Sequence, residues 1–218
     1  MPDHPHSSDR QPAGDVAARD VAAGRFAVWL DGMRRAIAGH DDADVPCGSC
    51  VGCCSSSQFV LIGPDEDDAL AHIPPELLFP APRKPTYVLM GYDEQGRCPM
   101  LGEHGCSIYA HRPRTCRTYD CRVLAAAGVA DRVDDKPLIV AQAMRWRFEL
   151  GSANDRVLQH AVVAAASYLE RRRAELPGDV APLTTTHVAV AAVMVHDLFL
   201  QHGDEPSPEQ VTARLRTR

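Results

Sequence analysis

The sequence predicts a mostly helical α+β protein in which a small β-hairpin and loop region carries a cysteine-rich site. Apolar residues recur at three- and four-residue steps along several segments, which is the period of an amphipathic helix. Short β-type runs bounded by glycine and proline are confined to the middle of the chain. All eight cysteines also fall there, between Cys47 and Cys121. With 218 residues, 45% of them hydrophobic, the chain is long enough to bury a core without disulfides.

The chain begins with a polar segment. Residues 1–14 are rich in proline, serine and histidine and are predicted to form a disordered tail, whereas residues 15–218 are expected to form a single domain. From Asp15 to His40 the apolar residues recur with a helical period, and we predict a helix there. The acidic residues that follow, together with Pro46, end this helix just before the first cysteine loop.

The middle of the chain alternates short strands and turns. Phe59–Ile62 is predicted to be a strand, and Asp65–Ile73 a helix whose acidic first turn suits the helix dipole and faces solvent. Thr86–Tyr92 is predicted to be a second strand. We expect a turn at Asp93–Gly96 and a return strand at Arg97–Leu101, which together make a hairpin.

The C-terminal half, residues 136–216, is predicted to be helical. A helix begins near Pro113, and further helices are expected at Lys136–Leu150, Asp155–Leu176 and Thr185–Gln201, with a short one after Pro208. The run from Val188 to Leu200 is apolar on most faces, so we expect it to be a buried central helix. Trp146 is interpreted as a core residue.

Charge and hydropathy restrict the partners and the compartment. The net charge of −6 argues against a general nucleic-acid partner, since phosphate contacts need an excess of Lys and Arg. No signal-peptide pattern is visible, and the longest apolar stretch is too short to cross a membrane. We therefore expect a cytoplasmic protein with reduced thiols, so metal binding is favoured over disulfides.

The first cysteine loop favours an iron–sulfur cluster over zinc. Zinc loops usually offer pairs of cysteines, whereas here Cys47, Cys50 and Cys53 follow one another at Cys-x-x-Cys steps. Iron–sulfur loops have this spacing and take a fourth sulfur from elsewhere in the chain. A [4Fe–4S] cluster is therefore the first expectation and Zn²⁺ the second.

Two features leave the number of centres open. The side chains of adjacent residues point apart, so Cys53 and Cys54 are not expected to serve one centre equally. Cys54 could bind a second centre, form a weak hydrogen bond or be a reactive thiol. Cys116 and Cys121 cannot share one face of an unbroken helix, so either the helix starts after Cys116 or the two have different roles.

Basic and imidazole side chains gather around the second cysteine stretch. A four-thiolate centre is negatively charged, and nearby guanidinium groups would offset that charge and lower the pKa values of the thiols. We therefore predict a cofactor-binding role for Arg112, Arg114, Arg117 and Arg122. His104 and His111 are the reserve metal ligands.

The combined cysteine pattern resembles a known family. It consists of the first loop, Cys98-Pro-Met-Leu, Gly105-Cys-Ser-Ile-Tyr109, His111-Arg-Pro113, Cys116-Arg117 and Tyr119-Asp-Cys121. Together these motifs, within residues 46–122, resemble the YkgJ-type cysteine-cluster family, a zinc- or iron-chelating domain that flagellin lysine methylases also resemble. The resemblance implies metal-ligand roles for Cys47, Cys50, Cys53, Cys54, Cys98, Cys106, Cys116 and Cys121. It does not imply methyl transfer.

The sequence thus predicts a metal-binding cysteine-cluster protein without assigning a reaction. The first hypothesis is an iron–sulfur protein with a redox or catalytic role, whose partner would be a redox donor. The second is a structural zinc module that fixes a helical scaffold for a protein partner. The third is metal sequestration or delivery.

Overall fold

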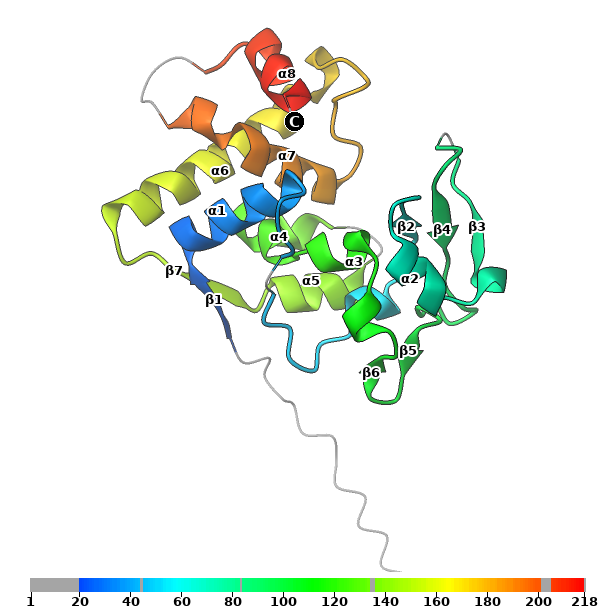
Figure 1. The fold of residues 1–218 in the computed structure, drawn as a ribbon. Helices are drawn as coiled ribbons and strands as arrows, with labels where there is room; N and C mark the ends of the chain where they lie inside the picture. The colour runs from blue at the N-terminus through cyan, green and yellow to red at the C-terminus, as the bar shows by residue number, and fades with distance from the viewer. Residues whose placement is uncertain (1–19, 44, 83, 134–135, 201–204, 218) are drawn as a thin grey trace, which may run out of the picture.

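Figure 1 shows a larger helical part beside a smaller part that contains short strands. The computed structural model describes residues 20–217, apart from residues 44, 83, 134–135 and 201–204. The predicted disordered tail at residues 1–14 lies outside the described residues. In the described chain helices predominate and the strands are short, which confirms the predicted α+β class.

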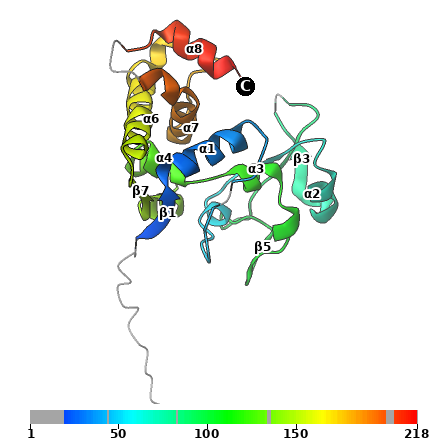
Figure 2. The same cartoon turned by 60° about the vertical axis from the view of Figure 1, so that its left-hand side comes forward.

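The larger part is a bundle organised around one buried helix. It contains α1 (Phe26–Ile37), α4 (Arg122–Ala126), α6 (Ala153–Arg171), α7 (Thr185–Val195) and α8 (Pro208–Arg216). Helix α7 packs against the other four, and Val193 and Val195 on it are fully buried. Figure 2 shows α6 and α7 side by side. The expected central helix is therefore confirmed, although its last turn is a 3-10 helix (His196–Phe199). Among the described helices, none combines the length and apolar character needed to cross a bilayer.

Asp155 ties the start of α6 to the start of α1. Its carboxylate accepts hydrogen bonds from the Ser152 backbone N–H (2.9 Å) and hydroxyl (2.6 Å). The Ser152 hydroxyl oxygen in turn accepts from the Asp155 backbone N–H at 3.0 Å, which completes a capping box. The Asp155 carboxylate also accepts a hydrogen bond from the Ala27 backbone N–H at 3.1 Å. The Ser152 hydrogen bonds are the main reason that the pKa of Asp155 falls to about 2. The charged carboxylate thus satisfies N–H groups at two helix starts at once.

Two segments predicted to be helical are strands. β1 (Val21–Arg25) pairs in parallel with β7 (Trp146–Glu149), with a bulge between Ala22 and Gly24; the φ of Gly24 is +85°. The prediction of a helix over Asp15–His40 is therefore wrong for the described residues before Phe26. The predicted helix Lys136–Leu150 is reduced to α5 (Pro137–Ala143). Both differences arise from contacts between distant segments. The ring of Phe148 on β7 packs against the rings of Phe26 and Trp29, with centroid distances of 5.0 Å and 4.9 Å respectively.

The smaller part contains a three-stranded antiparallel sheet. Its order is β2 (Val60–Ile62), β4 (Val88–Met90), β3 (Leu78–Pro80). The predicted return strand Arg97–Leu101 is wrong, because both edges of β4 are already occupied by β2 and β3. The chain instead forms a separate pair, β5 (Leu101–Gly102) with β6 (Gly105–Cys106). A small apolar cluster lies under the sheet and consists of Val60, Ile62, Ile73, Met90 and Ile108.

Short helices complete the smaller part. They are α2 (Asp67–His72), α3 (Arg114–Thr118) and the 3-10 segments η1 (Cys53–Ser55), η2 (Pro75–Leu77) and η3 (Tyr109–His111). Two further 3-10 segments, η4 (Ala130–Arg132) and η5 (Arg173–Glu175), belong to the larger, helical part. Glu66 links α2 to α3, because its carboxylate accepts the backbone N–H groups of Gly63 (2.8 Å) and Arg114. The acidic start of α2 is therefore not wholly solvated: the Glu66 residue is only 8% exposed.

Candidate metal centres

The first cysteine loop is held by its own backbone. The Cys50 N–H donates to the Cys47 carbonyl at 3.0 Å, and the Gly52 N–H points at the Cys50 Sγ at 3.4 Å. Gly52 lies against α5, where an added Cβ would come 3.2 Å from the Leu138 carbonyl oxygen. A side chain at position 52 would therefore push the loop away from α5. All eight cysteines are free of disulfides.

Cys53 and Cys54 open the 3-10 segment η1, where successive residues are about 120° apart. The thiols of Cys53 and Cys54 therefore interact with different neighbouring residues. Burial, followed by the negative charges of Cys121 and Cys47, raises the pKa of Cys53 well above its ordinary value. Burial, followed by the charges of Cys98 and Cys106, raises the pKa of Cys54 to about 11. Because charge interactions weaken with distance, the two adjacent thiols face different groups of cysteines.

The first thiol set consists of Cys47, Cys50, Cys53 and Cys121. Cys121 immediately precedes α4, is buried, and accepts a hydrogen bond from the Trp146 Nε1–H at 3.2 Å. Burial is the main cause that raises the pKa of Cys121 to about 12. The hydrogen bond from Trp146 lowers this pKa, whereas the charges of Asp120 and Cys47 raise it further. Trp146 is 3% exposed, so its predicted core position is confirmed, and its indole N–H also contacts a candidate ligand.

The second thiol set consists of Cys54, Cys98, Cys106 and Cys116. The Cys98 N–H donates to the Cys54 carbonyl at 2.7 Å, and Cys106 on β6 pairs with Leu101 on β5. Burial, then the charges of Cys98 and Cys54, raises the pKa of Cys116 to about 12. Three of its members, Cys98, Cys106 and Cys116, pack against the apolar cluster under the sheet.

The break between α3 and α4 separates Cys116 from Cys121. Helix α3 ends at Thr118 and α4 begins at Arg122, so the two cysteines do not lie on one continuous helix. Cys116 faces the second thiol set and Cys121 the first. The sequence left two alternatives open, and this arrangement agrees with the one in which Cys116 and Cys121 have different roles.

The sulfur atoms are spread more widely than in a closed zinc site. A tetrahedral ion with four Zn–S bonds needs sulfurs about 3.8 Å apart. Among the described residues, no three cysteine sulfurs lie within 4.8 Å of one another. A single zinc ion in either set would therefore require the thiols to move inwards.

The raised thiol pKa values imply that metal uptake depends on pH. Near neutral pH the thiols of Cys54, Cys116 and Cys121 keep their protons, since their pKa values lie at about 11, 12 and 12. A cation must displace those protons to bind thiolates. We expect metal-free protein titrated with Zn²⁺ to release several protons per chain and to bind more weakly as the pH falls from 8 to 6. Proton release in weakly buffered solution measures this, and uptake that is independent of pH would contradict it.

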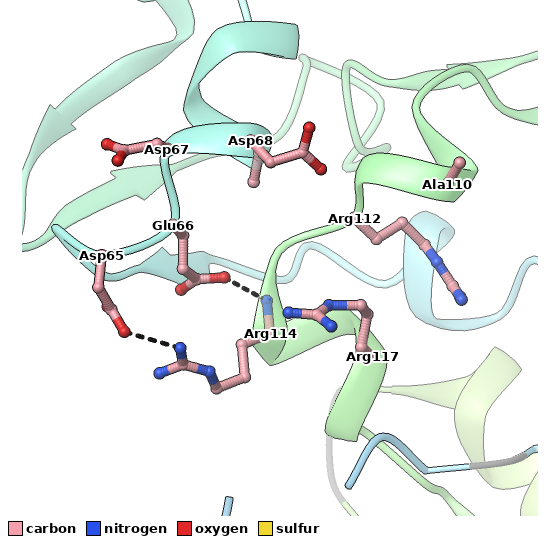
Figure 3. A pocket seen from close by; sticks show the side chains of 9 residues that line it. Asp65, Glu66, Asp67, Asp68, Ala110, Arg112, Arg114 and Arg117 are labelled. Carbon is pink, nitrogen blue, oxygen red and sulfur yellow. Dashed lines mark hydrogen bonds and ion pairs between the residues drawn. The ribbon is translucent and has the colours of Figure 1, made fainter.

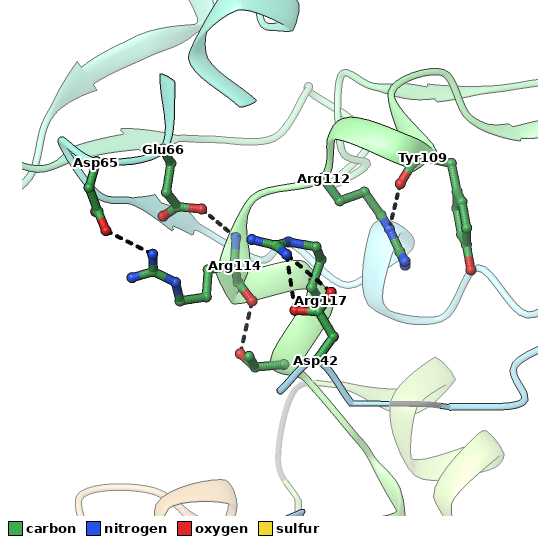
Figure 4. Close-up of polar contacts among 8 residues, drawn as sticks. Asp42, Asp65, Glu66, Tyr109, Arg112, Arg114 and Arg117 are labelled. Carbon is green, nitrogen blue, oxygen red and sulfur yellow. Dashed lines mark hydrogen bonds and ion pairs between the residues drawn. The ribbon is translucent and has the colours of Figure 1, made fainter. Parts of the chain in front are cut away.

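Two of the four predicted arginines act on the thiols. Arg112 stacks over the Tyr109 ring, 3.7 Å from its centroid, and its Nε–H donates to the Tyr109 carbonyl at 2.9 Å (Figure 4). The Arg112 charge opposes the rise in the pKa values of Cys54 and Cys116. Arg122, followed by Arg112, does the same for the pKa of Cys47 in the first set.

Arg114 and Arg117 face carboxylates. Arg114 pairs with Asp65 at 2.8 Å and Arg117 with Asp42 at 3.0 Å (Figure 4). Their predicted role at the metal centres stays a prediction. Of the reserve ligands, His104 is exposed in the turn between β5 and β6, and His111 contacts Asp68 at 2.9 Å.

Asp120 is a site residue that the sequence reasoning missed. It is 3% exposed and accepts hydrogen bonds from the Trp29 Nε1–H (2.8 Å) and the Arg122 backbone N–H (2.9 Å). It also pairs with the Arg122 guanidinium at 2.8 Å, and Arg122 reaches the Ala23 carbonyl on β1 at 3.2 Å. This buried pair fixes the turn that presents Cys121. The only sequence signal was its place between two motif residues, Tyr119 and Cys121.

The comparison with protein families agrees with this geometry. Residues 46–136 match the model of the CxxCxxCC family, described as a "putative zinc- or iron-chelating domain". The match confirms the resemblance drawn from the cysteine motifs and supports metal binding by this part of the chain. No curated protein and no solved structure matches the chain.

Proposed function

We propose that residues 46–136, which match the CxxCxxCC family model, hold two iron–sulfur clusters, one in each thiol set, and that the protein transfers electrons. The observation that carries the proposal is that the eight cysteines fall into two sets, with Cys53 in one set and the adjacent Cys54 in the other. Three cysteines of the loop join a remote fourth, Cys121, while the next cysteine in sequence joins the other set. Two-cluster ferredoxins distribute their ligands in the same manner, with one cysteine of the run serving the other cluster.

The surroundings of the thiols support a redox centre. A cluster with four thiolates carries negative charge, and nearby cations and hydrogen bonds raise its reduction potential. Arg112 interacts with thiols of both sets, while Arg122 and the Trp146 N–H lie near the first. The peptide bond between Cys53 and Cys54 would join the two clusters directly. With every cysteine bound to a cluster, no iron atom lacks a protein ligand, which favours electron transfer over catalysis at the metal. Eight reduced thiols also suit the cytoplasm, the compartment that we propose.

Anaerobic purification tests the proposal. We expect a brown protein with a broad visible absorption band that bleaches on reduction with dithionite. Two [4Fe–4S] clusters would give about eight iron atoms and eight acid-labile sulfides per chain. A colourless protein with stoichiometric zinc and no sulfide would contradict the cluster assignment.

A second candidate function is a pair of structural zinc sites. The small size of the apolar cluster in the smaller part favours it, because such a core rarely folds without a metal or another cross-link. In that case the metal would be colourless, and its removal by a chelator would unfold the smaller part. The same purified sample distinguishes the two candidates.

A further inference from the structure

Three possible metal ligands lie outside the cysteine sets. Asp68 and His72 are one turn apart on α2, and His111 ends the 3-10 segment η3. One ligand atom from each lies within 4.8 Å of the others. The His111 Nδ1 is 2.9 Å from a carboxylate oxygen of Asp68, and the His72 Nδ1 is 3.8 Å from the other. Two segments more than thirty residues apart in sequence therefore bring two imidazoles to one carboxylate.

We infer that Asp68, His72 and His111 bind a divalent transition-metal ion, separate from the cysteine centres. Two imidazole nitrogens and one carboxylate oxygen are ligands that suit Zn²⁺, Fe²⁺, Co²⁺ or Ni²⁺ better than Mg²⁺ or Ca²⁺. Three protein ligands also leave coordination positions open for water or a small anion. No thiol takes part, so this site is chemically distinct from both thiol sets.

The adjoining cavity leaves space for a further ligand on the open positions. Asp68 lines a hollow of about 250 Å³ whose other charged lining residues are Asp65, Glu66, Asp67, Arg112, Arg114 and Arg117. Figure 3 shows the Asp68 carboxylate on the side of this cavity that carries Arg112. A small ligand bound to the ion would lie in a hollow lined by both carboxylates and guanidinium groups, of which Arg114 and Arg117 already pair with Asp65 and Asp42.

The two rings must rearrange slightly to share an ion. They are stacked, with centroids 3.6 Å apart and planes inclined by 5°. A metal ion lies in the plane of each ring that binds it, so at least one ring has to turn. The side chains of His72 and His111 are 42% and 38% exposed, which leaves room for this movement. Asp68 lies within reach of both rings and can hold the ion between them.

Cobalt binding to full-length protein whose cysteine centres are already filled tests the inference. We expect one additional Co²⁺ per chain, with weak ligand-field bands and no new thiolate-to-cobalt charge transfer, and Mg²⁺ should not compete. His72→Ala and His111→Ala should each weaken this binding by at least about tenfold, the least that even an outer-shell partner contributes. His160→Ala is the matched control, since His160 is an exposed helical histidine on α6, and it should bind cobalt as the native chain does.

Several results would overturn the inference. They are the absence of an additional cobalt ion, equal binding by the two histidine variants and the control, or an additional ion whose spectrum shows thiolate ligation. The ligands are surface residues, so melting temperature and cysteine-bound metal should be unchanged in the variants. If either alanine variant is unstable, Asp68→Asn, which keeps the side-chain shape, takes its place with the same expected loss.

Discussion

Replacing Asp120 with alanine is expected to lower the free energy of unfolding by about 3–5 kcal/mol, since it removes one side of a buried ion pair. The Arg122 side chain is only 9% exposed, and Asp120 is its carboxylate partner at 2.8 Å. The substitution also removes the acceptor of the Trp29 indole N–H. Because Asp120 precedes Cys121, we further expect the variant to lose metal from the first thiol set before the second. Urea denaturation and metal analysis measure the two effects.

Asp179→Ala provides the matched control. Asp179 pairs with Arg216 at 2.9 Å, but the two side chains are 60% and 54% exposed. An exposed ion pair of this kind contributes about 0–1 kcal/mol. If Asp120→Ala destabilises the protein no more than Asp179→Ala, the buried pair does not support the turn at Cys121.

Local patterns predicted the longer helices α1, α6 and α7 well, but they predicted the strand pairs poorly. The helical period placed Phe26, Trp29 and Met33 on the buried face of α1, and the apolar run after Val188 predicted the central helix. The pairing of β1 with β7 joins residues far apart in sequence, and no local pattern reports such a partner. Similarly, the apolar character of Val88–Met90 predicted a strand but not that β2 and β3 would occupy both of its edges.

The candidate site shows the same division between local and distant information. Spacing alone showed that Cys53 and Cys54 point apart and that Cys116 and Cys121 cannot share an unbroken helix face. It could not show which distant cysteine each one faces, because that depends on how the loop, the β5–β6 pair and the two short helices meet. Asp68 and His72 have the i, i+4 spacing of a helical pair, but their neighbour His111 comes from a segment that only the fold brings close.

Cys53→Ser and Cys54→Ser are expected to remove different metal centres although the two residues are adjacent. Cys53 faces Cys121 and Cys47, so its loss should empty the first thiol set. Cys54 faces Cys98 and Cys106, so its loss should empty the second. Cys121→Ser and Cys116→Ser are the matched distant variants, one from each set. We expect Cys53→Ser to match Cys121→Ser in metal content and spectrum, and Cys54→Ser to match Cys116→Ser.

The metal content of anaerobically purified Cys53→Ser and Cys54→Ser tests the two-centre account most directly, whether the metal is iron or zinc. We predict that each variant keeps about half of the native metal, since one four-thiolate centre remains intact in each. The spectrum of the remaining centre should differ between the two variants. Loss of all metal in both variants, or full retention in either, would contradict the division of the eight cysteines into two sets.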